Sequence, residues 1–271
     1  MYSSIPQKKV LQNLGNVHNT SRIFIILFLF CSLLYADVFN IDGVDFHYRV
    51  PYKFTKNSKL IILFGGRNWS GEKTIKTYNF DPLADKYQAF LLSPSFKDNN
   101  YWEPEKWSGD ALKKAIKCLE NKHNLSFNEI YFYGYSAGGQ CAALFYNWMP
   151  DKVVAWGAHA CGVYPDKLNS TNAKVLITCG EGDIERYHIS KQFIFNYREH
   201  NGFLLWKPFK NLDHRLSPDV LLFAREWFDA ILNKKAIMAY GEDDTLKIDG
   251  DIDIEYKNPL YSAKLLELWQ K

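Results

Sequence analysis

The sequence predicts an α/β domain built on a doubly wound, mostly parallel sheet with helices on both faces. Three observations support this prediction. Short segments rich in β-branched and aromatic residues recur along the chain, they are apolar throughout rather than at alternate positions, and amphipathic helical patterns separate them. Continuous apolar runs are typical of strands covered on both faces. Strands that alternate with helices form parallel sheets through βαβ units.

The predicted elements begin with a hairpin at Asp42-Gly43, a common two-residue turn between alternating strands. Six buried strands are expected at residues 59–66, 89–96, 129–136, 152–162, 173–183 and 202–209. Helical patterns cover residues 109–120 and begin again after Ser217-Pro218, where serine is a candidate N-cap and proline takes the first helical position. No repeat or low-complexity linker interrupts residues 37–233, so we assign this range to one domain.

Composition bounds the class of protein. A chain of 271 residues can bury a sizeable core, and 47% hydrophobic with 23% charged residues is typical of a globular protein. The net charge is only +3, and basic residues are scattered among nearly as many acidic ones. Nucleic acid is therefore not expected as a partner.

The N-terminal segment, residues 1–36, is expected to be a signal peptide or an N-terminal anchor. Residues 23–36 form an uncharged apolar run that follows Lys8, Lys9 and Arg22. A run of this length is short for a membrane span but fits the apolar core of a secretory signal. Cleavage after Ala36 would give an exported chain, periplasmic or secreted, whereas an uncleaved segment would anchor it to a membrane.

An exported mature chain would keep four cysteines, Cys118, Cys141, Cys161 and Cys179, for which sequence leaves three pairings open. Buried free thiols are the alternative that their apolar surroundings favour. None forms a Cys-x-x-Cys pair, so no metal site is expected. The acidic extension at residues 234–271 is expected to form an exposed edge strand followed by a short helix. Asp249, Asp251 and Asp253 have the spacing of a calcium loop, but Ile254 replaces the glycine that its turn needs.

The stretch "YFYGYSAGGQCAALFY", residues 131–146, contains Gly-x-Ser-x-Gly between a strand pattern and a helix pattern. A tight strand-to-helix turn of this kind exposes a nucleophilic serine, and it requires small residues at Gly134 and Gly138. Ser136 is therefore the candidate nucleophile. The alternative is an ordinary serine in a glycine-rich turn.

An attacking serine needs a base, and the base needs an orienting acid. His214 lies in the loop after the last predicted strand, and Asp183 follows the strand before it, with Glu181 as the rival carboxylate. Parallel strands bring such loops to one edge of the sheet. Backbone N–H groups of Ala137 and of Gly66, or else Arg67, are the candidate oxyanion donors.

These landmarks occur in the order glycine loop, serine, acid, histidine, and with them the chain resembles the α/β-hydrolase family over about residues 40–233. It looks most similar to small secreted esterases of the feruloyl-esterase and polyhydroxybutyrate-depolymerase type. The family often has His-Gly in the oxyanion loop, where this chain has Phe64-Gly65. The interval from Cys161 to Lys174 is too short for a large lid domain.

The resemblance implies hydrolysis of a small-molecule or polymer-linked carboxylic ester through an acyl-enzyme on Ser136, with no cofactor. Four aromatic residues are candidates for substrate binding in an open cleft: Trp69, Trp102, Trp107 and Tyr135. The alternative is that these rings pack loops onto the domain. A peptidase of the same fold and a non-catalytic binding module are the rival functions.

Overall fold

The computed structural model describes residues 36–97, 100–243 and 245–271, and residues 36–271 form one compact unit. The expectations for the N-terminal segment fall on residues outside this range, apart from Ala36. In the part of the chain that is described, no helix combines the length and apolar character needed to cross a bilayer.

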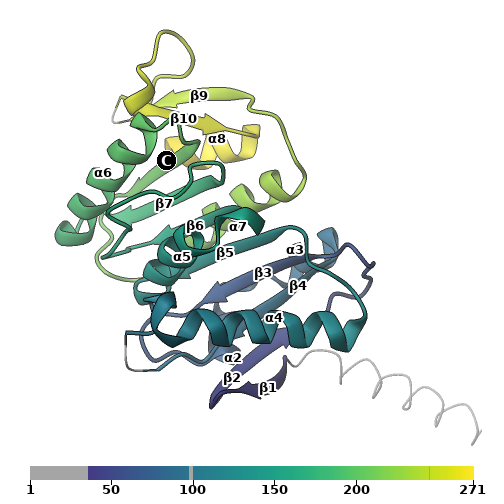
Figure 1. The fold of residues 1–271 in the computed structure, drawn as a ribbon. Coiled ribbons are helices and arrows are strands. Elements are labelled where there is room, and N and C mark those ends of the chain that lie inside the picture. The colour runs from purple at the N-terminus through teal and green to yellow at the C-terminus, as the bar shows by residue number, and fades with distance from the viewer. Residues whose placement is uncertain (1–35, 98–99, 244) are drawn as a thin grey trace, which may run out of the picture. The chain divides into compact units, whose positions relative to one another are not determined.

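The core of the unit is an eight-stranded sheet with the order β1-β2-β4-β3-β5-β6-β7-β8 (Figure 1). Strands β3 to β8 are parallel, whereas β1 and β2 form an antiparallel hairpin at one edge. Their bounds are β1 Asp37–Ile41, β2 Val44–Arg49, β3 Lys59–Phe64, β4 Ala89–Pro94, β5 Ile130–Tyr135, β6 Val153–His159, β7 Lys174–Gly180 and β8 Leu204–Phe209. Asp42 and Gly43 have positive φ angles of 52° and 84°, as the predicted hairpin turn requires.

Helices cover both faces of this sheet (Figure 1). Their bounds are α2 Gly71–Tyr78, α3 Asp81–Tyr87, α4 Gly109–His123, α5 Ala137–Trp148, α6 Ile184–Glu199, α7 Pro218–Leu232 and α8 Ala263–Gln270. Short helical turns lie at η1 Pro104–Ser108, η2 Pro150–Lys152 and η3 Ile254–Tyr256. Ser217 caps α7 by accepting a hydrogen bond from the N–H of Val220, which confirms the predicted start of that helix.

The hydrophobic core has two parts, one on each face of the sheet. Alternate residues of β3 belong to different parts: Leu60, Ile62 and Phe64 pack with α4 and α5, whereas Ile61 and Leu63 pack with α2, α3 and α7. Both faces of the strand are buried, which explains why the sequence shows continuous apolar runs instead of alternation. The predicted doubly wound fold is confirmed.

The strand order places a topological switch point between β3 and β5. The chain crosses from β3 to β4 in one direction and from β5 to β6 in the other. The carboxyl ends of two neighbouring parallel strands then diverge, and open α/β sheets bind ligands at such a position. The segment between β6 and β7, residues 160–173, contains no helix or strand, so no lid domain is inserted there.

The C-terminal extension differs from its prediction. Strands β9 Ala239–Glu242 and β10 Lys257–Leu260 pair with each other, and the acidic stretch at residues 249–254 is not an edge strand. Asp249 and Gly250 have φ angles of 54° and 120°, which break the extended backbone, and the Asp249 carboxylate accepts a hydrogen bond from the Tyr240 N–H. The short C-terminal helix is present as α8.

A buried ion pair holds this extension to the sheet. Arg198 of α6 is 1% exposed, and its Nη1 lies 2.8 Å from Oδ2 of Asp243, just after β9. Its Nη2 donates to the side-chain oxygen of Asn258 (2.8 Å), which also accepts from the Trp206 N–H of β8 (2.7 Å). Asn258 and the Trp269 indole, which donates to the Trp206 carbonyl, thereby satisfy backbone groups of the edge strand. The yellow C-terminal elements in Figure 1 lie at the opposite end from β1 and β2.

The four cysteines among the described residues, Cys118, Cys141, Cys161 and Cys179, are free thiols, and the last three are buried. Burial raises the pKa of both Cys161 and Cys179 to about 12, so these thiols stay protonated at neutral pH. The cysteines are therefore free thiols, as the alternative prediction had it, and none of the three possible disulfide pairings is formed.

Candidate active site

Ser136 lies between β5 and α5 with a φ angle of 57° and a ψ angle of −120°. A non-glycine residue in such a sparsely populated conformation costs about 1–3 kcal/mol, which the surrounding structure must offset. Backbone hydrogen bonds hold it on both sides: its N–H donates to the His159 carbonyl (2.9 Å), and its carbonyl accepts from the Gln140 N–H (3.1 Å). The strained turn projects the serine side chain from the carboxyl edge of the sheet.

Gly134 and Gly138 are needed because their neighbours leave no room for a side chain. A Cβ on Gly134 would lie 1.9 Å from the carbonyl oxygen of Gly138, and one on Gly138 would lie 2.1 Å from the carbonyl oxygen of Phe64. The helix after the serine thus packs directly on the ends of β5 and β3. The pattern predicted from sequence has a steric cause.

The structure brings Ser136, His214 and Asp183 together in one hydrogen-bonded series. The Oγ atom of Ser136 lies 2.9 Å from Nε2 of His214, and Nδ1 of His214 lies 2.6 Å from Oδ2 of Asp183. Since a carboxylate only accepts hydrogen bonds, Nδ1 carries a proton and Nε2 of the neutral ring can accept the serine proton. The series has the arrangement of a nucleophile, a base and an orienting acid.

Asp183 is the carboxylate that reaches His214, and the rival Glu181 is not. Asp183 precedes α6, is only 6% exposed, and receives a further hydrogen bond from Nη1 of Arg186 (3.2 Å). The Glu181 side chain is exposed, and its backbone N–H donates to the Phe209 carbonyl.

The predicted oxyanion donors Ala137 and Gly66 lie just after β5 and β3, the two strands of the switch point. Ala137 is the first residue of α5, so its N–H has no partner within the helix and lies at the positive end of the helix dipole. Gly66 follows β3, and its carbonyl accepts from the Trp69 N–H (3.0 Å). A Cβ on Gly66 would lie 3.1 Å from the Tyr135 ring, so this loop packs against the residue before the serine. The choice between Gly66 and Arg67 as second donor stays a prediction.

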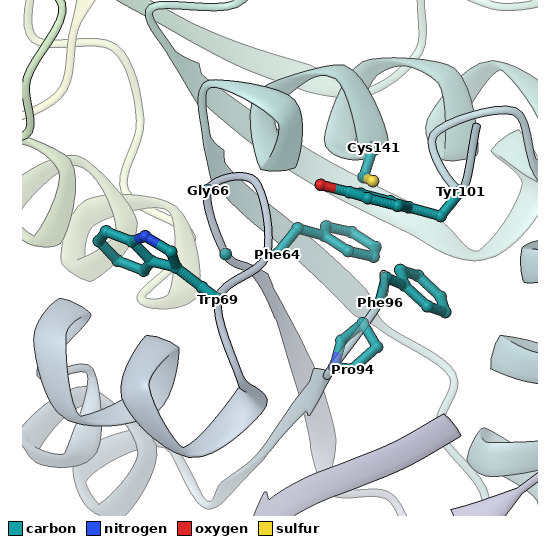
Figure 2. A pocket seen from close by; sticks show the side chains of 8 residues that line it. Phe64, Gly66, Trp69, Pro94, Phe96, Tyr101 and Cys141 are labelled. Carbon is teal, nitrogen blue, oxygen red and sulfur yellow. The ribbon is translucent and has the colours of Figure 1, made fainter. Parts of the chain in front are cut away.

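A small gap behind the Gly66 loop does not extend the site. Figure 2 shows Phe64 and Phe96 on one side of the loop and Trp69 on the other. The gap has a volume of about 10 Å³ and is lined by Phe64, Gly65, Gly66, Trp69, Pro94, Phe96, Tyr101 and Cys141. This volume is at the lower limit for one water molecule. The apolar packing there supports the loop rather than holding a substrate.

Ser136 opens instead onto a pocket of about 290 Å³. Its lining residues are Arg67, Ser136, Ala137, Gln140, Gly162, Arg186 and His214. The four aromatic candidates are absent from this lining. Gln140 and Arg186 were not predicted from the sequence, and Arg67 was considered only for its backbone N–H, because the three residues come from separate segments that border one pocket only in the folded chain.

The aromatic candidates instead pack loops and support the catalytic edge. The Trp107 ring lies edge-on to Phe96 with a centroid distance of 5.5 Å. Trp102 lies 5.8 Å from the guanidinium carbon of Arg67. Trp69 and Tyr135 lie 5.9 Å apart. The packing alternative therefore describes these rings better than an aromatic-lined cleft does.

Tyr135 and His159 support the loop that carries His214. The Tyr135 hydroxyl donates to the His214 carbonyl (3.1 Å), and burial, with Asp183 nearby, raises the pKa of this hydroxyl and keeps it a donor.

His159 is fully buried, and burial lowers its pKa to about 4. Its Nε2 donates to the Arg215 carbonyl (3.0 Å), and its Nδ1 accepts from the Thr178 hydroxyl (2.9 Å). The sequence shows His159 within an apolar strand pattern. A buried polar side chain needs hydrogen-bond partners, so this pattern could have indicated the contact.

Comparison with known proteins finds similarity in structure but not in sequence. No protein-family model matches the chain, and no curated protein matches it. A thermostable esterase is similar with a TM-score of 0.57 and 17% identity, over 68% of this chain and 56% of that one. The chain thus spans little more than half of that esterase.

Two further solved structures match over nearly their whole length. Poly(aspartic acid) hydrolase-1 from Sphingomonas sp. KT-1 has a TM-score of 0.56 and 17% identity, over 71% of this chain and 97% of that one. A poly(3-hydroxybutyrate) depolymerase from Bordetella parapertussis has a TM-score of 0.54 and 14% identity, over 82% and 99%. The chain has the α/β-hydrolase fold. The order of the strands, the strained turn at the serine and the similarity to these structures all indicate it.

Proposed function

We propose that this protein is a serine hydrolase that cleaves carboxylic esters through an acyl-enzyme on Ser136. The observation that carries the proposal is the unbroken hydrogen-bonded series from Ser136 Oγ through His214 to Asp183, with the serine held in a strained turn. The esterases among the similar structures are consistent with this function but share only the fold with this chain.

In the acylation step, Ser136 Oγ attacks the ester carbonyl carbon while Nε2 of His214 takes its proton. Asp183 stabilises the resulting imidazolium. The N–H groups of Ala137 and Gly66 bind the oxyanion, each contributing on the order of 10²–10³ in rate. The tetrahedral intermediate collapses, the C–O bond to the alcohol breaks, and His214 gives its proton to the leaving oxygen.

In the deacylation step, water takes the place of the alcohol. His214 accepts a proton from the water as its oxygen attacks the acyl carbon, and then returns that proton to Ser136 Oγ as the C–O bond to the serine breaks. The products are the carboxylic acid and the alcohol, and the free enzyme is restored. The steps use protein groups and one water molecule only.

The kinetic test uses 4-nitrophenyl butanoate and single variants of the series. Ser136→Ala and His214→Ala are each expected to lower kcat by about 10⁴–10⁶, and the double variant is expected to be no slower than either, because the two groups act as a unit. Glu181→Gln and His188→Gln, which change an exposed carboxylate and an exposed imidazole outside the pocket lining, are matched controls and should keep wild-type rates. Wild-type turnover by a folded Ser136→Ala variant would exclude the proposal.

We also propose that the chain is exported, on the apolar run at residues 23–36 alone. Cell fractionation with intact-mass measurement tests this. A chain outside the cytoplasm that begins at Asp37 would support a cleaved signal, and a full-length chain in the membrane fraction would indicate an anchor. A full-length chain in the cytoplasm would contradict export.

A further inference from the structure

Two arginines line the pocket at Ser136. Two of its lining residues, Arg67 and Arg186, carry guanidinium groups, and none of its lining residues carries a carboxylate. They come from different elements: Arg67 follows the Gly66 loop, and Arg186 lies in the first turn of α6. Because both cations border the same pocket, an anion bound there is attracted by both.

Arg67 is held beside the pocket by a ring instead of by an acid. Its guanidinium carbon lies 5.8 Å from the centre of the Trp102 ring. Within the described part of the chain, no carboxylate forms an ion pair with it. A cation over a ring face keeps its N–H donors, which lie in the guanidinium plane, available for a ligand. Arg67 is therefore a positioned cation with unused hydrogen-bonding capacity.

Arg186 is only partly neutralised. Its Nη1 lies 3.2 Å from Oδ1 of Asp183 and 3.6 Å from a carboxylate oxygen of Glu185, whose side chain is 76% exposed. A guanidinium has five N–H donors, and these contacts involve one nitrogen. The Nε atom lies 3.7 Å from the position of a Cβ built on Gly162, another lining residue. The Nε side of the Arg186 guanidinium therefore lies beside Gly162 in the pocket lining.

We infer that the substrate carries a carboxylate close to the scissile ester bond, within the reach of Arg67 and Arg186. This inference rests on the proposed function, because it specifies the ester that Ser136 would attack. Guanidinium groups bind carboxylates through paired hydrogen bonds. The pocket volume of about 290 Å³ is close to the lower end of the ~300–1,000 Å³ typical of ligand pockets, so it has room for a small acidic group. An acidic ester, such as a half-ester of a dicarboxylic acid, has this chemistry.

The test compares charged and neutral esters of the same shape. One pair has the charge on the acyl group: the 4-nitrophenyl esters of adipic acid and of its monoamide. The other pair has it on the alcohol: 3-carboxyphenyl and 3-carbamoylphenyl butanoate. In one of the two pairs, we expect the wild type to have a higher kcat/KM for the ester with the carboxylate than for the ester with the amide. The difference should arise mainly from a lower KM. The pair that shows the preference tells whether the acyl part or the alcohol part of the ester faces the arginines.

The variant Arg67→Gln removes one charge and keeps the backbone N–H. It is expected to reduce the preference for the carboxylate by about twofold to fivefold, as the loss of one exposed charge contact should. The matched control is Lys210→Gln, an exposed cation after β8 at the same edge of the sheet but outside the pocket lining. It should leave the preference unchanged. Raising the salt concentration from 20 mM to 500 mM should weaken the wild-type preference.

Equal kcat/KM values within both pairs in the wild type, or a preference that Arg67→Gln does not reduce, would overturn the inference. Turnover of the neutral esters in the same experiment separates the two proposals. If the neutral esters are cleaved by Ser136 without any preference for charge, only the inference fails. If no ester is cleaved and Ser136 is unreactive towards a fluorophosphonate, the proposed function fails, and the inference fails with it.

Discussion

The Nε2 atom of His159 lies 3.0 Å from the carbonyl oxygen of Arg215, the residue that follows His214. His159 ends β6, two strands from β8, and it also accepts a hydrogen bond from Thr178 on β7. The contact therefore fixes the loop of His214 to the centre of the sheet. Because a carbonyl oxygen only accepts, the ring must keep its proton on Nε2, and the Thr178 hydroxyl can then donate to Nδ1.

Burial lowers the pKa of His159 from its ordinary value of 6.5 to about 4, which makes stability depend on pH. The unfolded chain binds the proton more tightly, so folding is favoured above pH 6.5 and this contribution is lost as the pH falls towards 4. The loss is about 3 kcal/mol in the free energy of unfolding. Urea unfolding at pH 7 and pH 4 measures the difference in free energy of unfolding between wild type and His159→Gln. This difference should be smaller at pH 4 than at pH 7 by about that amount. A constant gap would contradict the assignment.

Tyr78 joins the ends of the two strands at the switch point. Its buried hydroxyl donates to the Phe64 carbonyl (2.7 Å) and accepts from the Tyr135 N–H (3.0 Å). Tyr78→Phe should cost about 1–3 kcal/mol because both backbone groups lose a partner, and kcat should fall by about tenfold as the Gly66 loop and the serine turn separate. Tyr87→Phe is the control, since its half-buried hydroxyl can be replaced by water. Equal effects of the two variants on kcat would argue against this role.

Gly134→Ala should destabilise the fold by about 4 kcal/mol or more, because its Cβ would overlap the Gly138 carbonyl. Gly162→Ala is the matched control: the nearest atom to its Cβ would be 3.6 Å away, an ordinary contact. Its free energy of unfolding should stay within about 0.5 kcal/mol of wild type. Chemical denaturation measures both values. A stable Gly134→Ala protein with wild-type spectra would show that the turn is less tight than described.

Asp243→Ala should destabilise the protein by about 3–5 kcal/mol, because it leaves the buried charge of Arg198 without its ion-pair partner. The control is Lys114→Ala, which breaks the exposed pair between Lys114 and Asp42 and should leave the free energy of unfolding nearly unchanged. If the two variants unfold at the same urea concentration, the C-terminal extension is not held through Arg198.

The sequence predicted the sheet well because burial on both faces leaves a local signal. Each of the six apolar runs contains a strand of the sheet, although the strands end two to three residues before several of the predicted limits. The extension was predicted less well. Its alternation of acid and isoleucine favoured a strand, whereas Asp249 and Gly250 have positive φ angles, and the Asp249 carboxylate accepts a hydrogen bond from the Tyr240 N–H.

The candidate site could be predicted where chain order limits the choice. Ser136, Asp183 and His214 each follow a strand of a parallel sheet, so their meeting at one edge was implied by the fold. The pocket lining was not, because Arg67 and Arg186 come from segments far apart in the sequence, and Arg67 contacts Trp102, which is also distant from it in the sequence. An aromatic residue in a loop has the same sequence pattern whether it binds substrate or packs, as Trp107 shows.

The most direct measurement of the central claim is covalent labelling with a fluorophosphonate, followed by mass spectrometry of the labelled peptide. An activated serine attacks the phosphorus atom and displaces fluoride, whereas an ordinary serine does not react at a comparable rate. One label per chain is expected, located on Ser136, absent from Ser136→Ala and strongly reduced in His214→Ala. A folded wild-type chain that takes up no label, or takes it up on another residue, would contradict an acyl-enzyme on Ser136.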